Sequence, residues 1–531
     1  MKKAKNSNIE CTDLKKGLFE AIALAVVLVA VVSVVKFRGG GSVNYYNSDA
    51  TWHALLTIEA YNETPKSQHL FLPIVSLGNL EDKWIPWGAT IPDDLGNYYY
   101  TSFSPAAYFF AWFFIKIFRL PVSENSLYLF NSLLFAVSAA MWGWLISLVY
   151  EKSLYRRVLV FVAVLTYVLS PELMHGMGIV FWAQSVMQVT LLMQICAYCL
   201  YKKYDSKAGK IIFFFMVFIN PYIEWTGYVA NIGFAVVELV LYWKKDKKTA
   251  VVNLCSIGCL TVCSFVAFIM HFLLRVDANV FFKTLYARFC ARNVSVPAPL
   301  VDVFSGYLKS FLWLWVLFLA LIIWNFMKNK KIELLHGIFA ALLAFPLLEN
   351  MLMKQHAISY SFDRMKFIFL FSFCICELAS NLLESYGGKK VKAEMGIITM
   401  VLGFGFLNLR AYMGDNALVW DIDYIKENEM IADYINENYQ DSVLALENAA
   451  VRGYINMLFM RGIYEFIDFN TAMEKAVSLG KRYVIMLNID NVGGWNMYDL
   501  NGATIYDLQA GETSILLVEN GAVSVGNITN K

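Results

Sequence analysis

The sequence predicts a polytopic α-helical membrane protein with a small α/β domain at its C-terminal end. Of its 531 residues, 58% are hydrophobic and only 16% are charged, whereas an average soluble domain is about 25% charged. The apolar residues stand in long blocks separated by short basic segments, which is typical of several membrane-spanning helices. This pattern and a mean hydropathy of +0.51 exclude soluble, disordered, fibrous and nucleic-acid-binding proteins. A net charge of +2 indicates no preference for acidic partners.

The first apolar block, residues 18–35, follows a lysine-rich start and predicts a retained membrane anchor rather than a removed signal peptide. No small-residue cleavage site follows it, because Lys36, Phe37 and Arg38 come next. Lysine-rich and arginine-rich ends stay in the cytoplasm. We therefore expect a cytoplasmic N-terminus and a chain that emerges outside near Lys36.

About ten further blocks predict spans, for a total of about eleven, whereas residues 105–118 predict a helix lying on the outer membrane surface. If residues 105–118 crossed the membrane, the later basic clusters would face outward; if they do not, every cluster faces the cytoplasm, as the positive-inside rule requires. These clusters are centred on Lys152, Lys203, Lys245, Lys330 and Lys390. The predicted spans are 18–35, 127–150, 158–169, 179–201, 211–219, 222–243, 251–274, 311–327, 332–353, 367–383 and 395–412.

The predicted topology gives a transmembrane domain, residues 1–414, with a long first outer loop, residues 36–124, and a mid-chain outer loop near 275–308. Residues 415–531 are of mixed polarity and predict an extracytoplasmic α/β domain. In this tail, helices are expected at 425–435 and 471–479, and short buried strands at 442–446, 483–487 and 514–518. We expect the tail to serve acceptor binding or stability.

Three sequence features carry a family resemblance. Asp49 stands soon after the first span, in Tyr-Tyr-Asn-Ser-Asp-Ala-Thr-Trp-His. The segment Phe103-Ser-Pro-Ala-Ala-Tyr-Phe-Phe continues into the apolar block that ends at Phe118, and Val164-Leu-Thr-Tyr-Val-Leu-Ser-Pro lies at the end of a later span. With them the layout resembles the GT-C membrane glycosyltransferases, relatives of which include the protein O-mannosyltransferases and the aminoarabinose transferase of lipid A. The likeness covers residues 18–275, and the remainder only by topology.

The sequence also departs from the family pattern. An alanine follows Asp49 where the family often has a second acid, and Ser104 stands where the family has the first proline of a pair. The oligosaccharyltransferase signature Trp-Trp-Asp-Tyr-Gly is absent from the sequence. The resemblance therefore points to the superfamily and leaves the subfamily open.

The resemblance implies an inverting hexosyl- or pentosyltransferase in the plasma membrane. It would move a sugar from a polyprenyl-phosphate donor to an extracytoplasmic glycan, lipid or protein acceptor in cell-surface polysaccharide or glycolipid assembly. No Walker A, Rossmann, HExxH or paired zinc CxxC pattern occurs, so no organic cofactor or metal site is expected, although a divalent metal is left open. A polysaccharide polymerase or ligase, and a lipid-linked sugar flippase or transporter, are the alternatives. The sugar, the acceptor and the oligomeric state are not specified by the sequence.

Acids near the outer membrane face are candidates for the general base that such a transfer requires. Asp49 precedes a predicted helix, 49–61, and the alternative is that Ser48 or Asp49 caps this helix. Glu172 lies in a short outer loop, where a solvated acid is the alternative. Glu224 lies in an outer hairpin, and acids near membrane depth usually face a cavity or a partner because burying their charge is costly. We expect Asp49 to be the base, with Glu172 and Glu224 supporting the cavity.

Basic residues on the outer side are candidates for binding the phosphate. His356, Arg364 and Lys366 lie close together in sequence, in a late outer loop similar in placement to a His- and Lys-containing loop of GT-C enzymes. Arg364 could bind a phosphate through two parallel hydrogen bonds, and the alternative is that these side chains reach toward lipid headgroups. Arg288 and Arg292, four residues apart on one helical face, are a second candidate, and they also keep the polymerase alternative open.

Tyr99 belongs to an aromatic stretch of the first loop, Tyr98-Tyr-Tyr. Aromatic residues can stack on a sugar ring, and they also anchor proteins at the membrane interface. Tyr99 is therefore a candidate substrate-binding residue with interface anchoring as the alternative.

Overall fold

The structure is a computed structural model that describes residues 2–38, 47–78, 89–243, 246–293, 298–386, 390–415, 429, 432–446, 463–464, 468–488, 494–499, 504–510, 514–519 and 522–527. The chain divides into two compact units. The first contains residues 1–40, 128–269 and 289–419, and the second contains residues 41–127, 270–288 and 420–531.

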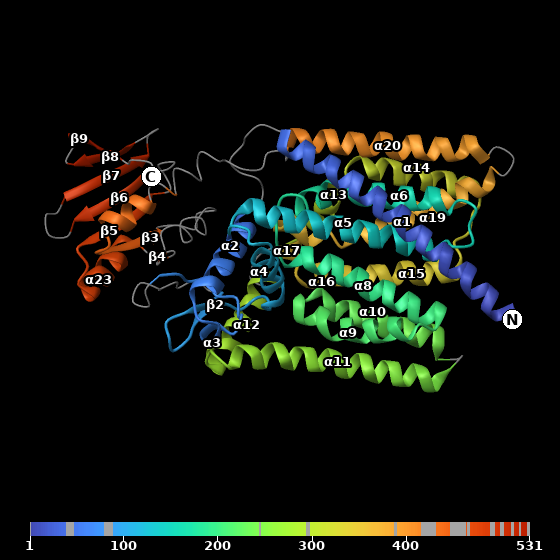
Figure 1. Cartoon of the computed structure of the whole chain (residues 1–531), viewed down its shortest axis with the longest axis horizontal. Helices are drawn as coiled ribbons and strands as arrows, with labels where there is room; N and C mark the ends of the chain where they lie inside the picture. The colour runs from blue at the N-terminus through green and yellow to red at the C-terminus, as the bar shows by residue number, and fades with distance from the viewer. Residues whose placement is uncertain are drawn as a thin grey trace. The chain divides into compact units, whose positions relative to one another are not determined.

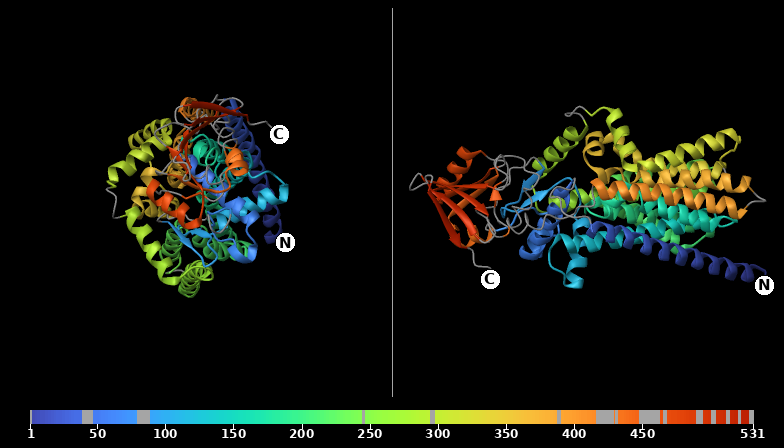
Figure 2. Two further views of the ribbon diagram at one scale, coloured as in Figure 1. Left: turned by 90° about the vertical axis from the view of Figure 1, so that its left-hand side faces the viewer. Right: turned by 90° about the horizontal axis from the view of Figure 1, so that it is seen from above.

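The first unit is a bundle of long helices that run side by side (Figures 1 and 2). α8 and α19 are its centre, because 78% and 72% of the most apolar stretch of each helix is buried. α1 and α11 lie at its periphery, where only 22% of the corresponding stretch is buried. The helices that lie wholly or partly in this unit are α1 (Lys2–Arg38), α5 (Glu124–Val149), α6 (Arg156–Val168), α7 (Pro171–Gly176), α8 (Ala183–Tyr204), α9 (Lys207–Ile223), α10 (Thr226–Tyr242), α11 (Lys247–Leu273), α12 (Ala278–Asn293), α13 (Leu300–Phe311), α14 (Trp313–Met327), α15 (Leu334–Ala344), the short 3-10 helix η2 (Phe345–Leu347), α16 (Leu348–Leu352), α17 (Lys354–Ser359), α18 (Ser361–Arg364), α19 (Phe367–Ser385) and α20 (Lys390–Asp415).

Every predicted span overlaps one or more helices, but the helices differ in length. In the described residues, seven helices are long and apolar enough to cross a membrane, or up to eight if the bent pair α13–α14 counts as one span. α6, α9 and α10 are shorter, with 13, 17 and 17 residues. The structure thus supports a multi-pass membrane protein, while the count of about eleven spans stays a prediction.

Basic clusters gather at one end of the bundle, as expected if they all lie on the same side of the membrane. Arg157 at the start of α6 pairs with Glu20 of α1 at 3.0 Å. Lys203 at the end of α8 pairs with Glu151 just after α5 at 3.1 Å. α11 and α20 both begin at the end where α1 begins (Figure 1). Which side of the membrane this end faces stays a prediction.

A tight hairpin joins α9 to α10. A Cβ on Gly227 would lie 2.3 Å from the backbone of Asn220 and Pro221, so only glycine fits this turn. Below the turn, Asn220 donates to Gln194 at 2.7 Å, and Gln194 donates to Asn231 at 2.8 Å. Such amide bonds between helices hold α8, α9 and α10 together where the apolar membrane gives little preference for helix association.

α13 and α14 are bent by 96° at Leu312. This residue has φ 39° and ψ −116°, a conformation that is disfavoured for residues with a Cβ atom. Asn408 of α20 satisfies the backbone at the break, since its Oδ1 accepts from the Trp313 N–H at 3.1 Å and its Nδ2 donates to the carbonyls of Leu169 and Phe311. α13 itself was expected to be part of the mid-chain loop.

The second unit contains the first loop, which folds as α2 (Ser48–Glu63), α3 (Lys66–His69), the antiparallel strands β1 (Thr90–Pro92) and β2 (Tyr98–Tyr100), and α4 (Ala106–Phe118). The Trp112 indole of α4 donates to Asn62 of α2 at 3.0 Å. α4 is the predicted block 105–118, and its 13 residues are too few to span the membrane.

The C-terminal part of this unit is a mixed sheet with the order β4-β3-β5-β6-β7-β8-β9 in the described residues (Figure 1). β3 pairs in parallel with β4 and β5, and the later strands form an antiparallel meander. The predicted strands at 442–446, 483–487 and 514–518 and the helix at 471–479 are present, whereas most of 425–435 lies outside the described residues. The bounds are β3 (Ser442–Leu446), β4 (Ile463–Tyr464), α23 (Phe469–Leu479), β5 (Tyr483–Asn488), β6 (Gly494–Asp499), β7 (Thr504–Ala510), β8 (Ser514–Glu519) and β9 (Ala522–Asn527).

Candidate active site

Glu172 and Arg364 form a buried ion pair in the first unit. α7 begins with Pro171 at its first position, which places Glu172 in the first turn. The Glu172 Oε1 atom lies 2.9 Å from a terminal nitrogen of Arg364, and both side chains are under 10% exposed, at 7% and 8%. Burial raises the pKa of Glu172, and the Arg364 charge opposes this rise. The two predicted residues, far apart in sequence, are thus brought together.

All three nitrogens of the Arg364 guanidinium have partners in the protein. Its Nε donates to the Ser310 hydroxyl of α13 at 2.9 Å, and one terminal nitrogen donates to the carbonyl of Ala357 at 2.6 Å. A Cβ on Gly306 would lie 3.1 Å from the Arg364 side chain, so this glycine lets α13 approach closely. The guanidinium therefore ties α7, α13 and α17 together, and in this arrangement it does not present two parallel donors to a phosphate.

Asp363 links His356 to α8. The His356 Nδ1 bonds to one carboxylate oxygen of Asp363, and the Gln184 side-chain amide donates to the other at 2.5 Å. Burial lowers the pKa of His356 to about 4, against the opposing effect of Asp363. A neutral ring that donates its Nδ1–H fits this value. Burial would raise the pKa of Asp363, but the charge and hydrogen bond of His356 and the charge of Lys366 hold it below its usual value.

Lys366 stands among carboxylates at the start of α19. Its ammonium donates to Glu349 of α16 and to the Thr226 hydroxyl, the latter at 3.0 Å. Glu224 follows α9 directly and accepts the Thr226 backbone N–H at 2.8 Å. Burial alone would lower the pKa of Lys366, but Glu349, Asp363 and Glu224 raise it above its usual value. Lys366 is therefore a firmly charged ammonium.

These side chains form one site, which we call the charged cluster. Its seven members are buried, which is costly for charges unless they are paired. Arg292 of α12 is also buried, and its positive charge acts on His356 and Asp363. The members of the charged cluster are Glu172, Glu224, Glu349, His356, Asp363, Arg364 and Lys366.

Asp49 belongs to the second unit, where α2 begins at Ser48. Asn47 occupies the N-cap position without a side-chain cap hydrogen bond, so neither Ser48 nor Asp49 is the cap residue. Asp49 lies in the first turn, and burial raises its pKa, although the backbone N–H of Ala50 opposes the rise. One turn further along, His53 is 2% exposed, and its ring centroid lies 4.7 Å from that of Tyr100.

Tyr99 and Arg288 also lie in the second unit. Tyr99 is fully buried in β2, and its hydroxyl donates to Asp93 at 2.8 Å. Its ring is therefore part of the packed first loop and is not open to stack on a sugar in this arrangement. The Arg288 Nε donates to the Ser102 hydroxyl at 3.4 Å.

Glu349, Asp363 and Gln184 were not among the predicted site residues. Glu349 lies inside the predicted span 332–353, and an acid inside a span is a signal for a buried partner or cavity. Asp363 stands directly between the predicted residues of the 354–366 segment. Gln184 carries no comparable signal, because a single amide at the start of a span is common.

In the described part of the chain, no group of three or more His, Cys, Asp and Glu side chains is placed to hold a metal ion. Three of the four carboxylates of the charged cluster are instead paired with Arg364, Lys366 and His356, and the fourth, that of Glu224, accepts the Thr226 N–H.

No protein-family model and no curated protein matches the sequence. The structure is similar to that of ArnT from Cupriavidus metallidurans bound to undecaprenyl phosphate, with a TM-score of 0.56 over 89% of this chain and 94% of that chain at 11% identity. It is also similar to the Archaeoglobus fulgidus oligosaccharyltransferase in complex with Zn and sulfate, with a TM-score of 0.52 over 86% of this chain and 67% of that chain at 11% identity. The same archaeal enzyme, AglB, in complex with an inhibitory peptide and a dolichol-phosphate gives a TM-score of 0.51 over 94% of this chain and 76% of that chain at 10% identity. The resemblance that the sequence suggested is confirmed at the level of the fold: this chain has the fold of the GT-C membrane glycosyltransferases.

Proposed function

We propose that this protein is an integral membrane glycosyltransferase that moves a hexosyl or pentosyl group from a polyprenyl-phosphate donor to an extracytoplasmic glycan, lipid or protein acceptor. The observation that carries the proposal is the shared fold with ArnT, whose structure holds undecaprenyl phosphate and is matched over 94% of its length. The AglB structure with a dolichol-phosphate adds a second neighbour with a polyprenyl carrier. We place the protein in the plasma membrane with its N-terminus in the cytoplasm.

Asp49 is the proposed general base. In an inverting transfer the acceptor oxygen forms a bond to the anomeric carbon as the bond from that carbon to the phosphate oxygen breaks. The base takes the hydroxyl proton, and the carrier leaves as polyprenyl phosphate. Asp49 follows the first span closely, so it stays near the membrane surface where the carrier phosphate must lie. Asp49 is partly buried, and a carboxylate whose pKa is raised by burial is also a stronger base than a solvated one.

The charged cluster is proposed to support the donor phosphate. Lys366 and Arg292 are the best candidates for direct contact, because Arg364 already binds Glu172, Ser310 and backbone carbonyls. Arg364 then acts by holding α7 and α13 in place. His356 positions Asp363, and Glu172 and Glu224 balance the positive charges.

The test is a transfer assay with purified protein and a panel of undecaprenyl-phosphate sugars, with and without a chelator, because the archaeal neighbour contains Zn. Asp49→Asn should lower turnover by about 10²–10⁴-fold while the donor lipid still binds, since removing a general base typically costs that much. Asp94→Asn is the matched control, because Asp94 is an exposed acid of the same loop.

The pH profile gives a second readout for the same base. The active form of Asp49 is ionised and is lost as the pH falls through its pKa, which burial raises. The acid limb of kcat/KM should therefore lie above the ordinary value of an aspartate, about 3.9, and should vanish from the residual activity of Asp49→Asn. If Asp49→Asn works within a few-fold of the unsubstituted protein while Glu172→Gln or Glu224→Gln is inactive, the base is in another loop.

A further inference from the structure

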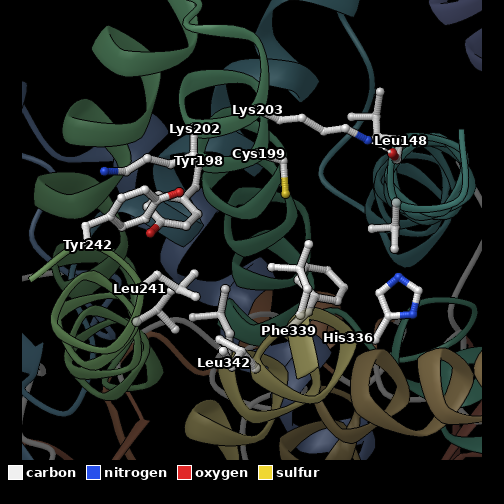
Figure 3. A pocket seen from close by; sticks show the side chains of 14 residues that line it. Leu148, Tyr198, Cys199, Lys202, Lys203, Leu241, Tyr242, His336, Phe339 and Leu342 are labelled. Atoms are coloured by element: carbon white, nitrogen blue, oxygen red, sulfur yellow. Dashed lines mark hydrogen bonds between the residues drawn. The ribbon is translucent and has the colours of Figure 1, made fainter. Parts of the chain in front are cut away.

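A cavity of about 370 Å³ lies between helices of the first unit, at the end where the basic clusters gather (Figure 3). This volume falls within the range of small-molecule sites, about 300–1,000 Å³. The walls come from the ends of α5, α8 and α10 and from α15. None of the lining residues belongs to the charged cluster, so the proposed transfer reaction does not use this space.

The cavity is amphipathic. Leu241, Phe339 and Leu342 cover the apolar side, and Lys202 and Lys203 lie on the opposite side (Figure 3). Such a lining fits a ligand with a long apolar body and a charged end better than a soluble polar metabolite.

Neighbouring residues place the cavity at the level of lipid headgroups. Tyr204 follows the two lysines at the end of α8, and Trp243 follows Tyr242 at the end of α10. Tyrosine and tryptophan concentrate at the boundary between acyl chains and headgroups, and lysine marks the cytoplasmic loops. The apolar wall thus reaches toward the acyl region, and the lysines lie where phosphates do.

Each lysine at the rim has a carboxylate partner, and Lys203 can bind a second acceptor. Lys202 is held by Glu238, with its ammonium 2.6 Å from one carboxylate oxygen, and Glu238 is fully buried. Lys203 is more open, with 38% of its side chain exposed, and it bonds to Glu151 at 3.1 Å and to the Leu148 carbonyl at 2.6 Å. An ammonium has three N–H groups, so a further acceptor can still bind Lys203.

Two further lysines follow α8 in the chain. Lys207 and Lys210 lie in the first turn of α9, and both are exposed. Basic pockets between spans on the cytoplasmic side are suited to anionic lipid headgroups. The remaining donor of Lys203 and the apolar interior therefore point to the same kind of ligand.

We propose that this cavity binds a membrane phospholipid with an anionic headgroup, with an acyl chain against α10 and α15 and the phosphate at Lys203. The ligand would join the ends of α5, α8, α10 and α15. This inference does not depend on the proposed glycosyl transfer.

Cys199 allows a direct test, because this native thiol lines the cavity. Purified protein is treated with a methanethiosulfonate reagent, and the modification of each cysteine is followed by peptide mass spectrometry. Dioleoyl-phosphatidylglycerol should slow modification of Cys199 about five- to tenfold more than dioleoyl-phosphatidylcholine, in keeping with one or two lysine contacts to an anionic head. Cys290 of α12, which does not line the cavity, is the internal control and should react at the same rate throughout.

Native mass spectrometry with two variants supplies an independent arm. Lys203→Gln should abolish the preference for phosphatidylglycerol, and Leu342→Trp should fill the apolar side and weaken both lipids. Lys328→Gln is the matched control, since Lys328 is a basic residue that does not line the cavity. Equal protection of Cys199 by both lipids, or an unchanged preference in Lys203→Gln, would overturn the proposal. Stronger protection by undecaprenyl phosphate than by phosphatidylglycerol would also overturn it and assign the cavity to the carrier.

Discussion

Arg364 has one ion-pair partner among the described residues, Glu172. Removing the Glu172 charge would therefore leave the Arg364 charge without a carboxylate partner. Breaking a buried ion pair by removing one partner typically costs about 3–5 kcal/mol, because the other charge stays buried and uncompensated. We expect Glu172→Gln to lower the free energy of unfolding by about this amount. Chemical denaturation in detergent micelles, followed by tryptophan fluorescence, measures the change.

The matched control is the pair of Arg157 and Glu20, whose side chains are 64% and 29% exposed. Glu20→Gln should cost at most about 1 kcal/mol, because exposed pairs contribute little. If both variants lose the same small amount, the Glu172–Arg364 pair is not a structural element of the cluster.

His356 gives the cluster an acid sensitivity whose sign is fixed by its lowered pKa. An unfolded histidine titrates near 6.5, whereas burial holds the pKa of His356 at about 4 in the folded protein. As the pH falls from 6.5 toward 4, the unfolded chain binds a proton that the folded chain does not, so stability is lost. Between pH 7.5 and pH 5 this loss should reach about 2 kcal/mol. In His356→Gln, which keeps a donor for Asp363, the dependence in this window should be flatter, and an unchanged slope would contradict the assignment.

The sequence could indicate where charged residues lie close together, but not which groups each of them binds. His356, Arg364 and Lys366 were grouped because they lie close together on the predicted outer side, which is otherwise poor in basic residues. Hydrogen bonds to Ser310 and to backbone carbonyls depend on tertiary packing. The sequence therefore suggested a phosphate ligand at Arg364, where the structure shows a guanidinium bonded to Glu172, Ser310 and two backbone carbonyls. Glu349 could have been predicted from its place inside a span.

At the scale of elements, the bend between α13 and α14 is the feature that most departs from a regular span. Leu312 has φ 39°, where a side chain is strained and glycine is not. Leu312→Gly should therefore stabilise the protein by about 1 kcal/mol, after the entropy cost of glycine is subtracted from a strain of about 1–3 kcal/mol. Thermal unfolding in detergent measures this, and Leu312→Ala, which keeps the strain, should show no gain. A lower unfolding temperature in Leu312→Gly would show that the bend is not strained.

This bend could not be predicted, because no glycine or proline lies at residues 311–313. The apolar sequence runs through the break, and the Asn408 amide that satisfies the backbone comes from α20, far along the chain. In contrast, α4 was predicted from the sequence with nearly the right bounds, since the positions of the later basic clusters argue against its being a span. α2 was predicted as well, with its start displaced by one residue.

For the whole molecule, the decisive prediction is that all the basic clusters between the spans face the cytoplasm. A cysteine at position 152 should react with a membrane-impermeant maleimide only after the cells are permeabilised, because Lys152 is expected in the cytoplasm. A cysteine at position 94, in the exposed part of the first loop, should react in intact cells. The background from native cysteines is measured in the unsubstituted protein. Labelling of position 152 in intact cells would invert the topology and remove the argument for an outer active site.

The class of membrane fold was recognisable from sequence although the structural neighbours are only about a tenth identical. Span spacing, loop lengths and a few motif residues survive such divergence because the membrane thickness and the helix geometry impose them. Individual contacts do not survive in the same way. The layout was therefore predictable, whereas the partners of each charged side chain were not.

The tight turn between α9 and α10 has a consequence for how the chain enters the membrane during synthesis. α9 has 17 residues, begins with lysines and contains Asn220 and Pro221 near its far end. If α9 stood alone in lipid, the side-chain amide of Asn220 would have no partner, and this would destabilise the segment in the membrane. Gly227 lets the chain fold back at once, so Asn231 of α10 reaches the Val217 carbonyl of α9 at 2.8 Å. The translocation machinery would then release the two segments together as a preassembled hairpin, with α8 already in place to receive their amides.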